Sequence, residues 1–340
     1  MVNNSEVVAV GVGSAGIRIA SLLSRKQIEI DRFAYVSCDR SDFSTVDQDA
    51  AIEIESPIDQ KLTPAIVRGL AFASLDKIRA AIGGSKVVLV IAGLGGATGS
   101  GLAPLVASIA REAGSKVVGV AVMPFEFEKK MKFYAGVSLR RLRGSSLGVI
   151  VIDNDTLLNA SSEDSTLATL YDSANKAAVR ALGSLLSKTT EGSRAIGLGK
   201  ILGAVAGRGY SLLGVSSGNG TDRAEDALAG AVVSIGKVAE TKQAERTVVN
   251  LSGDSSLSVK EVGLVVDRVG SIMDNEAMEV EYAVDQSGSS QLQVALLASG
   301  FRATKYDDYD PLSQVLGDRI LDDEADVSLA EGLEALQPCD

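Results

Sequence analysis

The chain has 340 residues, a formal net charge of −11 and no histidine, and 46% of its residues are hydrophobic. This length suits roughly two globular domains, whereas the negative charge argues against nucleic acid as a partner, because phosphates are neutralised by clustered Lys and Arg. The absence of histidine excludes Ser-His-Asp triads and His-ligated zinc, and two cysteines are too few for a disulfide framework, which predicts a cytoplasmic protein.

The first half of the chain alternates between apolar strands and helices. Strands are predicted at 6–12, 32–37, 86–92, 115–122 and 147–152, and helices at 16–25, about 65–82 and 101–113. The strands are continuously apolar, as in sheets that helices cover on both faces. The alternation therefore predicts an α/β fold with a Rossmann-like, doubly wound parallel sheet.

A long helical pattern over 165–188 separates this half from a smaller α/β region, with strands at 247–253, 278–284 and 292–299 and a helix at 258–273. From about residue 303 the chain is polar and acidic, and its last twenty residues hold seven carboxylates and no Lys or Arg. A mostly mobile tail is expected there. We predict an N-terminal α/β domain (1–164), a long central helix with the loop after it (165–200), a second, smaller α/β domain (201–303) and an acidic tail (304–340).

A first glycine-rich turn lies in VVAVGVGSAGIRIA (7–20), where Gly11, Gly13 and Gly16 stand between a strand and a helix. This is the GxGxxG pattern of a dinucleotide-binding turn, and Asp39 ends the second strand where a ribose-binding acid would lie. The pattern alone is compatible with an NAD-dependent oxidoreductase, or with glycines that merely tighten the turn.

A second glycine-rich turn, GLGGATGSG (93–101), also follows a strand and precedes a helix. A dinucleotide enzyme needs one phosphate cradle, whereas two cradles on one sheet suit a triphosphate, with the hydroxyls of Thr98 and Ser100 as further donors. No Lys follows either turn, so the Walker pattern is absent, and backbone N–H groups would hold the phosphates.

The segment GGATGSG (95–101) resembles the tubulin/FtsZ signature GGGTG[ST]G, with one glycine replaced by alanine. Further segments resemble family motifs in the same order along residues 6–302, and they are closer to prokaryotic FtsZ than to eukaryotic tubulin. They are GVGSAG (11–16), SCDRSD (37–42), PFEFE (124–128), IDNDTLL (152–158), LYDSANKAAV (170–179), GNGTDRAEDAL (218–228), VVNLSGDSSLSVKEV (248–262) and ASGF (298–301). On these residues the chain is identified as a divergent, FtsZ-like member of the tubulin/FtsZ superfamily.

The resemblance implies the tubulin/FtsZ fold, with residues 1–164 as a GTPase-type domain that binds GTP or GDP, and it allows a magnesium ion beside the phosphates. Asp39 is kept from the family's NTDAQ segment, whereas Arg18 replaces an Asn that contacts the base, which affects base selectivity. The residues implied to cradle the phosphates are Gly13, Ser14, Ala15, Gly16, Gly95, Gly96, Ala97, Thr98, Gly99 and Ser100.

The resemblance also assigns residues to the sugar and the base. Glu128 aligns with the acid that binds the ribose, and Asn154 with an asparagine near it. Asn175 would read guanine, since its amide offers both a donor and an acceptor, and Tyr171 takes the place of a stacking Phe. Lys132 stands where the family has an Arg near the phosphates, or belongs to a solvated helix face within the basic run 129–143.

In the family, a neighbouring subunit completes the hydrolytic site with a loop after the central helix, whose NxDxxD acids position the attacking water. Aligned back from GYSLLG (209–214), this loop falls at about 195–200, and the two acid positions hold Gly197 and Lys200. Neither residue is a base, and loss of such groups lowers a rate by about 10²–10⁴-fold. We therefore expect weak or absent GTP hydrolysis; the alternative is an active GTPase in which Glu191 supplies the acid.

The partners implied by the resemblance are copies of the chain itself, joined head to tail into open filaments, or an FtsZ-like paralogue, with a role in cell division or cell shape. The acidic tail has no basic amphipathic helix. We therefore expect no direct membrane insertion, and an adaptor would bind at the tail.

Overall fold

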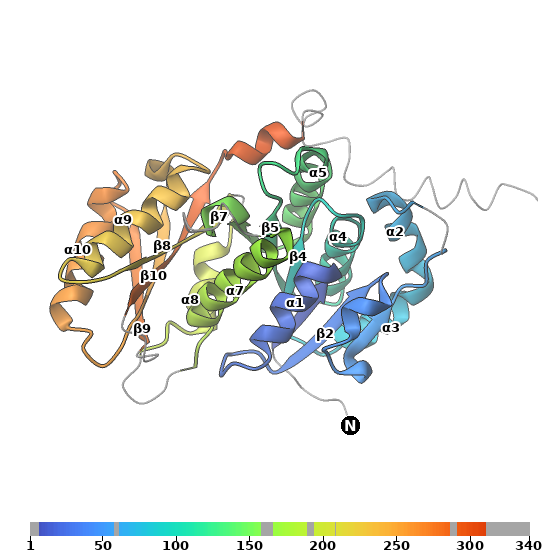
Figure 1. The fold of residues 1–340 in the computed structure, drawn as a ribbon. Coiled ribbons are helices and arrows are strands. Elements are labelled where there is room, and N and C mark those ends of the chain that lie inside the picture. Colours follow the sequence, from blue (N-terminus) through green and yellow to red (C-terminus); the bar gives the residue numbers. More distant parts are fainter. Residues whose placement is uncertain are drawn as a thin grey trace, which may run out of the picture.

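The computed structural model describes residues 7–57, 61–157, 166–188, 194–207, 209–285 and 291–310. Within these residues ten strands form one sheet, in the order β3-β2-β1-β4-β5-β6-β7-β10-β8-β9 (Figure 1). The strands are β1 (Val7–Val12), β2 (Arg32–Ser37), β3 (Ala51–Glu53), β4 (Val87–Gly93), β5 (Lys116–Met123), β6 (Gly148–Asp153), β7 (Tyr210–Gly218), β8 (Arg246–Ser252), β9 (Glu279–Asp285) and β10 (Leu292–Phe301). The helices are α1 (Gly13–Leu23), α2 (Pro64–Leu70), α3 (Leu75–Ile82), α4 (Ala97–Glu112), α5 (Lys129–Ser145), α6 (Asn154–Leu157), α7 (Leu167–Leu185), α8 (Leu198–Val205), α9 (Arg223–Gly236) and α10 (Val259–Ile272).

The sheet changes character along its width. Neighbouring strands run parallel from β3 to β7, β10 is antiparallel to both β7 and β8, and β9 is again parallel to β8. The predicted parallel sheet is therefore confirmed for the part that contains both glycine-rich turns. The strands predicted after residue 200 continue the same sheet through β7 and β10.

Helices cover the sheet on both faces, because its strands bury side chains on each side. Val90 of β4 joins a core with Leu102 of α4, whereas its neighbour Leu89 joins the opposite core with Ile17 of α1. All of these side chains are at most 3% exposed. This two-sided burial explains why the strands are continuously apolar in the sequence, and it confirms the doubly wound arrangement.

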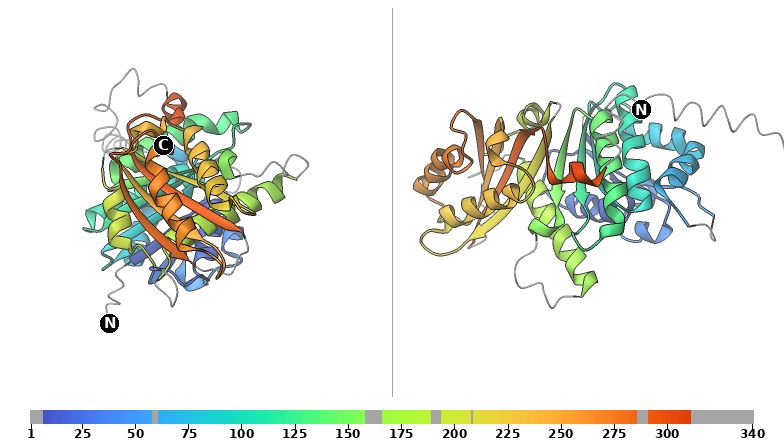
Figure 2. Two further views of the ribbon diagram at one scale, coloured as in Figure 1. Left: turned by 90° about the vertical axis from the view of Figure 1, so that its left-hand side faces the viewer. Right: turned by 90° about the horizontal axis from the view of Figure 1, so that it is seen from above.

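The long helix predicted over 165–188 is confirmed as α7. It contacts α1 on one side and β8 and β10 on the other, and it lies midway along the long axis of the molecule in Figure 1 and in the right-hand view of Figure 2. Its buried face includes Leu182 and Leu185, which are 1% and 3% exposed. The helix thus connects the blue and green elements, which carry the glycine-rich turns, with the yellow and orange ones.

The prediction of a single helix at about 65–82 is wrong in one respect, because this segment forms two helices. α2 ends at Leu70, a 3₁₀ turn spans Ala71–Ser74, and α3 begins at Leu75. Gly69 and Ser74 are weak helix formers, and Ser74 has non-helical dihedral angles of −115° and 9°. The periodicity of apolar residues persists across the break and hides it in the sequence.

The start of the predicted acidic tail is ordered. Thr304 caps a 3₁₀ turn at Lys305–Tyr309, and the Tyr306 side chain is buried. Asp310 accepts a hydrogen bond of 2.8 Å from Arg140 of α5. Residues 304–310 are therefore part of the folded body, and the remainder of the tail (311–340) lies outside the described residues.

An acid-sensitive ion pair joins α9 to α10. The Arg223 guanidinium donates to Glu261 at 2.6 Å, and Glu261 also accepts from the backbone N–H of Ser258 at 2.8 Å. These contacts, Arg223 first, lower the pKa of Glu261 to about 2. Because an unfolded Glu binds its proton at higher pH, acid favours the unfolded chain, and this stabilisation is lost as the pH falls from about 5 to 2.

We expect Glu261→Gln to lower the free energy of unfolding by about 2 kcal/mol at pH 7 and to flatten its dependence on pH below 5. Urea unfolding at several pH values measures both effects. Glu225→Gln is the matched control, because Glu225 pairs with Arg268 at the surface, where both side chains are about half exposed, and such pairs contribute less than about 1 kcal/mol. Equal losses in the two variants would contradict the prediction.

Candidate functional site

The two glycine-rich turns meet at one edge of the sheet. β1 and β4 are parallel neighbours, with Val12 opposite Ala92. From this edge the chain continues into α1 on one face of the sheet and into α4 on the other. The strand order reverses between β1 and β4, and ligands of doubly wound sheets bind at such a point.

Glycines let the two turns approach each other and the strands. Gly13 and Gly95 have φ angles of 67° and 107°, which favour glycine. A Cβ atom on Gly99 would lie 2.1 Å from the carbonyl oxygen of Gly93, and one on Gly13 would lie 3.2 Å from the amide nitrogen of Gly99. The start of α4 is therefore packed directly on the end of β4, in contact with the start of α1.

Both helices leave their first amides available to an anion. The N-cap residues are Val12 for α1 and Gly96 for α4, and neither provides a side-chain cap. Neither first turn contains Asp or Glu. Unsatisfied N–H groups and the positive ends of two helix dipoles therefore converge on the same space, which is a suitable environment for phosphate.

A cleft of about 600 Å³ lies in front of these turns. It brings together residues from both glycine-rich turns, from the segment after β5, from the end of β6 and from α7. Of the residues proposed from the sequence, those that line it are Gly13, Ser14, Ala15, Arg18, Gly96, Ala97, Thr98, Gly99, Glu128, Asn154, Tyr171 and Asn175.

Three other proposed residues support the turns from behind. A Cβ atom on Gly16 would lie 2.1 Å from the carbonyl oxygen of Ile91, so Gly16 permits close packing of α1 on β4. The buried Ser100 hydroxyl accepts a hydrogen bond of 2.7 Å from the backbone N–H of Gly95. Ser100 therefore fixes the shape of the second turn, and Gly16, Gly95 and Ser100 do not line the cleft.

Two proposed residues lie away from the cleft lining. Asp39 is exposed and accepts a 2.8 Å hydrogen bond from the N–H of Ser41, which begins a 3₁₀ turn. Lys132 lies 3.4 Å from Glu126, and its ammonium group is 5.0 Å from the centre of the Tyr309 ring. Local capping and surface packing account for these two side chains, and neither lines the cleft.

Glu128 is held in place on both oxygens. Its Oε2 accepts from the backbone N–H of Phe125 at 2.8 Å, and its Oε1 accepts from the Tyr171 hydroxyl. Burial, together with this carboxylate, raises the pKa of Tyr171 to about 12, so the phenol remains a donor at neutral pH. Tyr171 also packs edge-on against Phe125, at 5.5 Å between ring centres.

We expect Tyr171→Phe to weaken GDP binding about fivefold, because the ring is kept while the hydrogen bond that orients Glu128 is lost. Calorimetric titration with GDP measures this change. Tyr134→Phe serves as a control, since Tyr134 is 38% exposed and does not line the cleft. An unchanged affinity of the Tyr171 variant would show that the ribose side does not depend on this bond.

The sequence did not reveal every neighbour of the site. Leu94 and Met131 form apolar parts of the cleft wall. Cys38 lies near Thr98 of the second turn; burial raises the pKa of its thiol, and the Thr98 side chain partly offsets this rise. The position of Cys38 one residue past β2 was the available signal, because β2 is next to β1 in the sheet.

Comparison with known proteins decides the family. Residues 6–162 match the GTPase domain of the tubulin/FtsZ family. Over 316 residues the chain is 29% identical to the cell division protein FtsZ of Buchnera aphidicola subsp. Schizaphis graminum (strain Sg), an alignment that covers 90% of this chain and 82% of that protein. The chain carries the GTPase domain of the tubulin/FtsZ family.

Solved structures agree with the tubulin/FtsZ fold. An empty FtsZ dimer from M. jannaschii superimposes with a TM-score of 0.74 at 24% identity, over 86% of this chain and 88% of that one. A GTPγS-bound protofilament of CetZ2 from Haloferax volcanii gives a TM-score of 0.70 at 21% identity, over 89% of this chain and 95% of that one. The match to the GTPase domain leaves no support for the oxidoreductase interpretation, which rested on the first glycine-rich turn alone.

The loop at 195–200 aligns with the family's loop of catalytic acids, and it does not line the cleft of its own chain. Gly197 has a φ angle of 80° and precedes α8, and Lys200 lies in the first turn of that helix. The Lys200 ammonium is 2.6 Å from Glu281 of β9. Glu191, the alternative acid, lies outside the described residues.

Among the residues that the structure describes, no group of three Cys, Asp or Glu side chains could hold a metal ion. None of the helices in this part of the chain is long and apolar enough to cross a membrane.

Proposed function

We propose that this chain binds GTP or GDP in the cleft between α1, α4 and α7. The observation that carries this proposal is the convergence of two uncapped helix N-termini from adjacent strands. Backbone amides from both turns would hold the phosphates, with the Thr98 hydroxyl as a further donor. The similar CetZ2 structure, a GTPγS-bound protofilament, supports a guanine nucleotide.

The remaining cleft residues suit a nucleoside. Glu128 and Asn154 offer acceptors on the side where a ribose would lie, and Asn175 offers both a donor and an acceptor to a base. Arg18 lines the same cleft and adds a positive charge near the first turn. A magnesium ion bound with GTP would take its ligands mainly from the phosphates, water and a hydroxyl such as that of Thr98, because the described residues contain no carboxylate cluster.

We further propose head-to-tail association into filaments, with a role in cell division or cell shape. Two similar structures, an FtsZ dimer and a CetZ2 protofilament, support this assembly. Met131 lines the cleft and is 39% exposed, and Phe127, which precedes the cleft residue Glu128, is 54% exposed. A second copy would cover these apolar side chains. A paralogue could take the place of the second copy, and an adaptor would bind beyond residue 310.

Hydrolysis in such filaments would be weak. The loop offered to the neighbouring nucleotide would present Gly197 and Lys200, which cannot accept a proton from water. An active GTPase that uses Glu191 is the competing proposal. We also propose that residues 1–164 form the nucleotide-binding domain and 201–303 the C-terminal domain.

Nucleotide released from the purified, heat-denatured protein should be GTP or GDP by chromatography. GTP hydrolysis is then measured against protein concentration, with light scattering as the readout of assembly. We expect scattering to rise with GTP while turnover stays at least tenfold below that of an ordinary FtsZ. Turnover that matches an ordinary FtsZ and falls in Glu191→Gln would favour the competing proposal, and absence of guanine nucleotide would overturn the binding proposal.

A further inference from the structure

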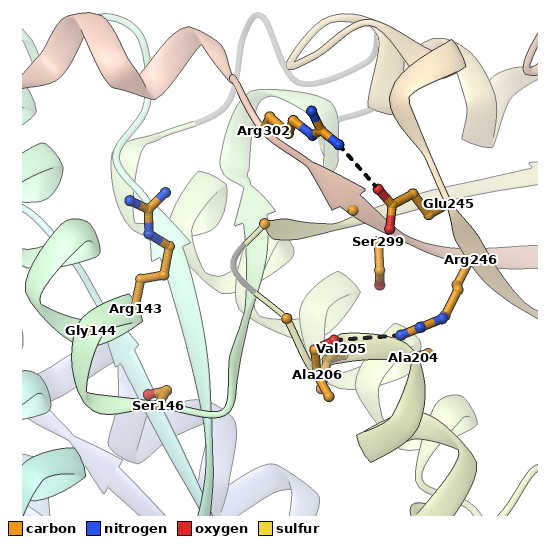
Figure 3. Close-up of a pocket in the computed structure, with 13 residues that line it drawn as sticks. Arg143, Gly144, Ser146, Ala204, Val205, Ala206, Glu245, Arg246, Ser299 and Arg302 are labelled. Carbon is orange, nitrogen blue, oxygen red and sulfur yellow. Dashed lines mark hydrogen bonds and ion pairs between the residues drawn. The ribbon is translucent and has the colours of Figure 1, made fainter. Parts of the chain in front are cut away.

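A second pocket, of about 750 Å³, lies at the edge of the sheet opposite the nucleotide cleft (Figure 3). The cleft follows the ends of β1, β4 and β5, whereas this pocket lies where β6 and β7 begin. Its walls come from the end of α5, the segment between α8 and β7, the start of β8 and the end of β10. Four segments that are distant in the sequence thus build it.

The pocket concentrates positive charge in a chain with a net charge of −11. Arg143 stands on one side and Arg246 and Arg302 on the other, together with Glu245 (Figure 3). Arg302 lies 3.9 Å from Glu245 and Arg246 lies 3.6 Å from Glu279, so both ion pairs are long and solvent-exposed. Such pairs contribute little and leave the guanidinium donors of Arg302 available to a ligand. Arg246 is held more firmly, because it also donates to the carbonyl oxygens of Gly203 at 2.9 Å and Ala206 at 3.5 Å, at the end of α8.

Arg143 has no carboxylate partner among the described residues. Its guanidinium lies 4.8 Å from the centre of the Tyr210 ring, a stacking contact that orients it without using its N–H donors. A guanidinium held by a ring face is suited to bidentate recognition of an oxyanion.

A buried hydroxyl without a partner lies in the same pocket. Ser299 is 4% exposed, and its Oγ has no hydrogen-bond partner in the described part of the chain. In Figure 3 its side chain points from β10 into the space between the arginines. An unsatisfied buried hydroxyl costs free energy unless something bonds to it, so this group indicates a ligand or a bridging water.

We propose that this pocket binds a small phosphate-bearing anion. Three guanidinium groups and a serine hydroxyl are the groups that recognise phosphate oxygens, and the volume is that of a small-ligand site. The site is separate from the nucleotide cleft, so the inference goes beyond the proposed function. An anion here would join α5 of the nucleotide-binding part to β8 and β10.

The test is calorimetric titration of the full chain with inorganic pyrophosphate in the presence of saturating GDP, which keeps the phosphate-binding turns occupied. The GDP titration itself is recorded first, so that failure of the proposed nucleotide site is seen separately. The variant combines Arg143→Gln with Arg302→Gln and leaves Arg246 unchanged, because Arg246 also bonds the end of α8. We expect its Kd for pyrophosphate to rise at least about tenfold, with unchanged GDP affinity.

The matched control combines Arg79→Gln with Arg268→Gln, which removes the same charge from exposed ion pairs outside the pocket. Ser299→Ala should weaken pyrophosphate binding several-fold without lowering the melting temperature, since it removes an unsatisfied hydroxyl.

Equal pyrophosphate binding by wild type and the double Gln variant, or equal losses in the control, would overturn the proposal. So would binding of a synthetic peptide of residues 321–340 in place of pyrophosphate, because the site would then recognise the acidic tail.

Discussion

Gly99→Ala is expected to weaken guanine-nucleotide binding by at least about a hundredfold. The added Cβ would lie 2.1 Å from the carbonyl oxygen of Gly93, which is backbone and cannot rotate away. Relief of this contact moves the start of α4 from the end of β4, and the amides of the second turn no longer converge with those of α1. Loss of several charge-assisted hydrogen bonds accounts for an effect of this size.

The matched control is Gly263→Ala in the middle of α10, where an added Cβ meets no atom within 4 Å. This variant should keep its nucleotide affinity and gain about 0.5–1 kcal/mol of stability, since Ala is a better helix former than Gly. GDP titration and thermal melting separate loss of binding from loss of folding. A folded Gly99→Ala protein with wild-type GDP affinity would show that the second turn does not hold the nucleotide.

Lys200→Asp is expected to raise GTP turnover about tenfold or more. It places a carboxylate at one of the acid positions of the loop, where it could accept a proton from water at a neighbouring subunit's nucleotide. The first turn of α8 also accommodates Asp better than Lys, because the helix dipole is positive there. The change removes the 2.6 Å contact with Glu281, which at this exposure costs less than about 1 kcal/mol.

Lys200→Asn is the control, because it removes the same ion pair without supplying a base. Turnover is measured as phosphate release at several protein concentrations, and the gain should appear only where light scattering reports assembly. A gain that is independent of protein concentration, or equal in the Asn variant, would contradict a site completed by a neighbour. No gain in the Asp variant would leave Gly197, whose φ of 80° disfavours other residues, as the limiting position.

Much of the fold could be predicted from the sequence, because the signals are local. β2 was predicted at its observed bounds and β4 to within one residue, since an apolar run bounded by glycine or charge is visible in one segment. The break between α2 and α3 was missed, because apolar periodicity continues through Ser74. The ordered segment 304–310 was missed as well, since its anchor on Arg140 is far away in the sequence.

The candidate site was likewise predictable only in part. The two glycine-rich turns could be placed together, because parallel neighbours in a doubly wound sheet end at one edge. Asp39 and Lys132 lie outside the cleft lining, since a side chain on a loop or helix surface follows its nearest partner, here Ser41 and Glu126. The arginine pocket joins Arg143, Arg246 and Arg302, whose proximity is a property of the whole sheet and leaves no local pattern.

The packing of residues 304–310 determines how the molecule would carry a mechanical load. Asp310 is held by Arg140 of α5, and Lys305 contacts Asp153 at the end of β6. Asn154, the next residue, lines the nucleotide cleft. A pull applied beyond residue 310 would therefore be resisted first by α5 and the end of β6, beside the cleft, before it reached β10. Tension from a tethered partner would thus act on the nucleotide site before the strands at the far end of the sheet unfold.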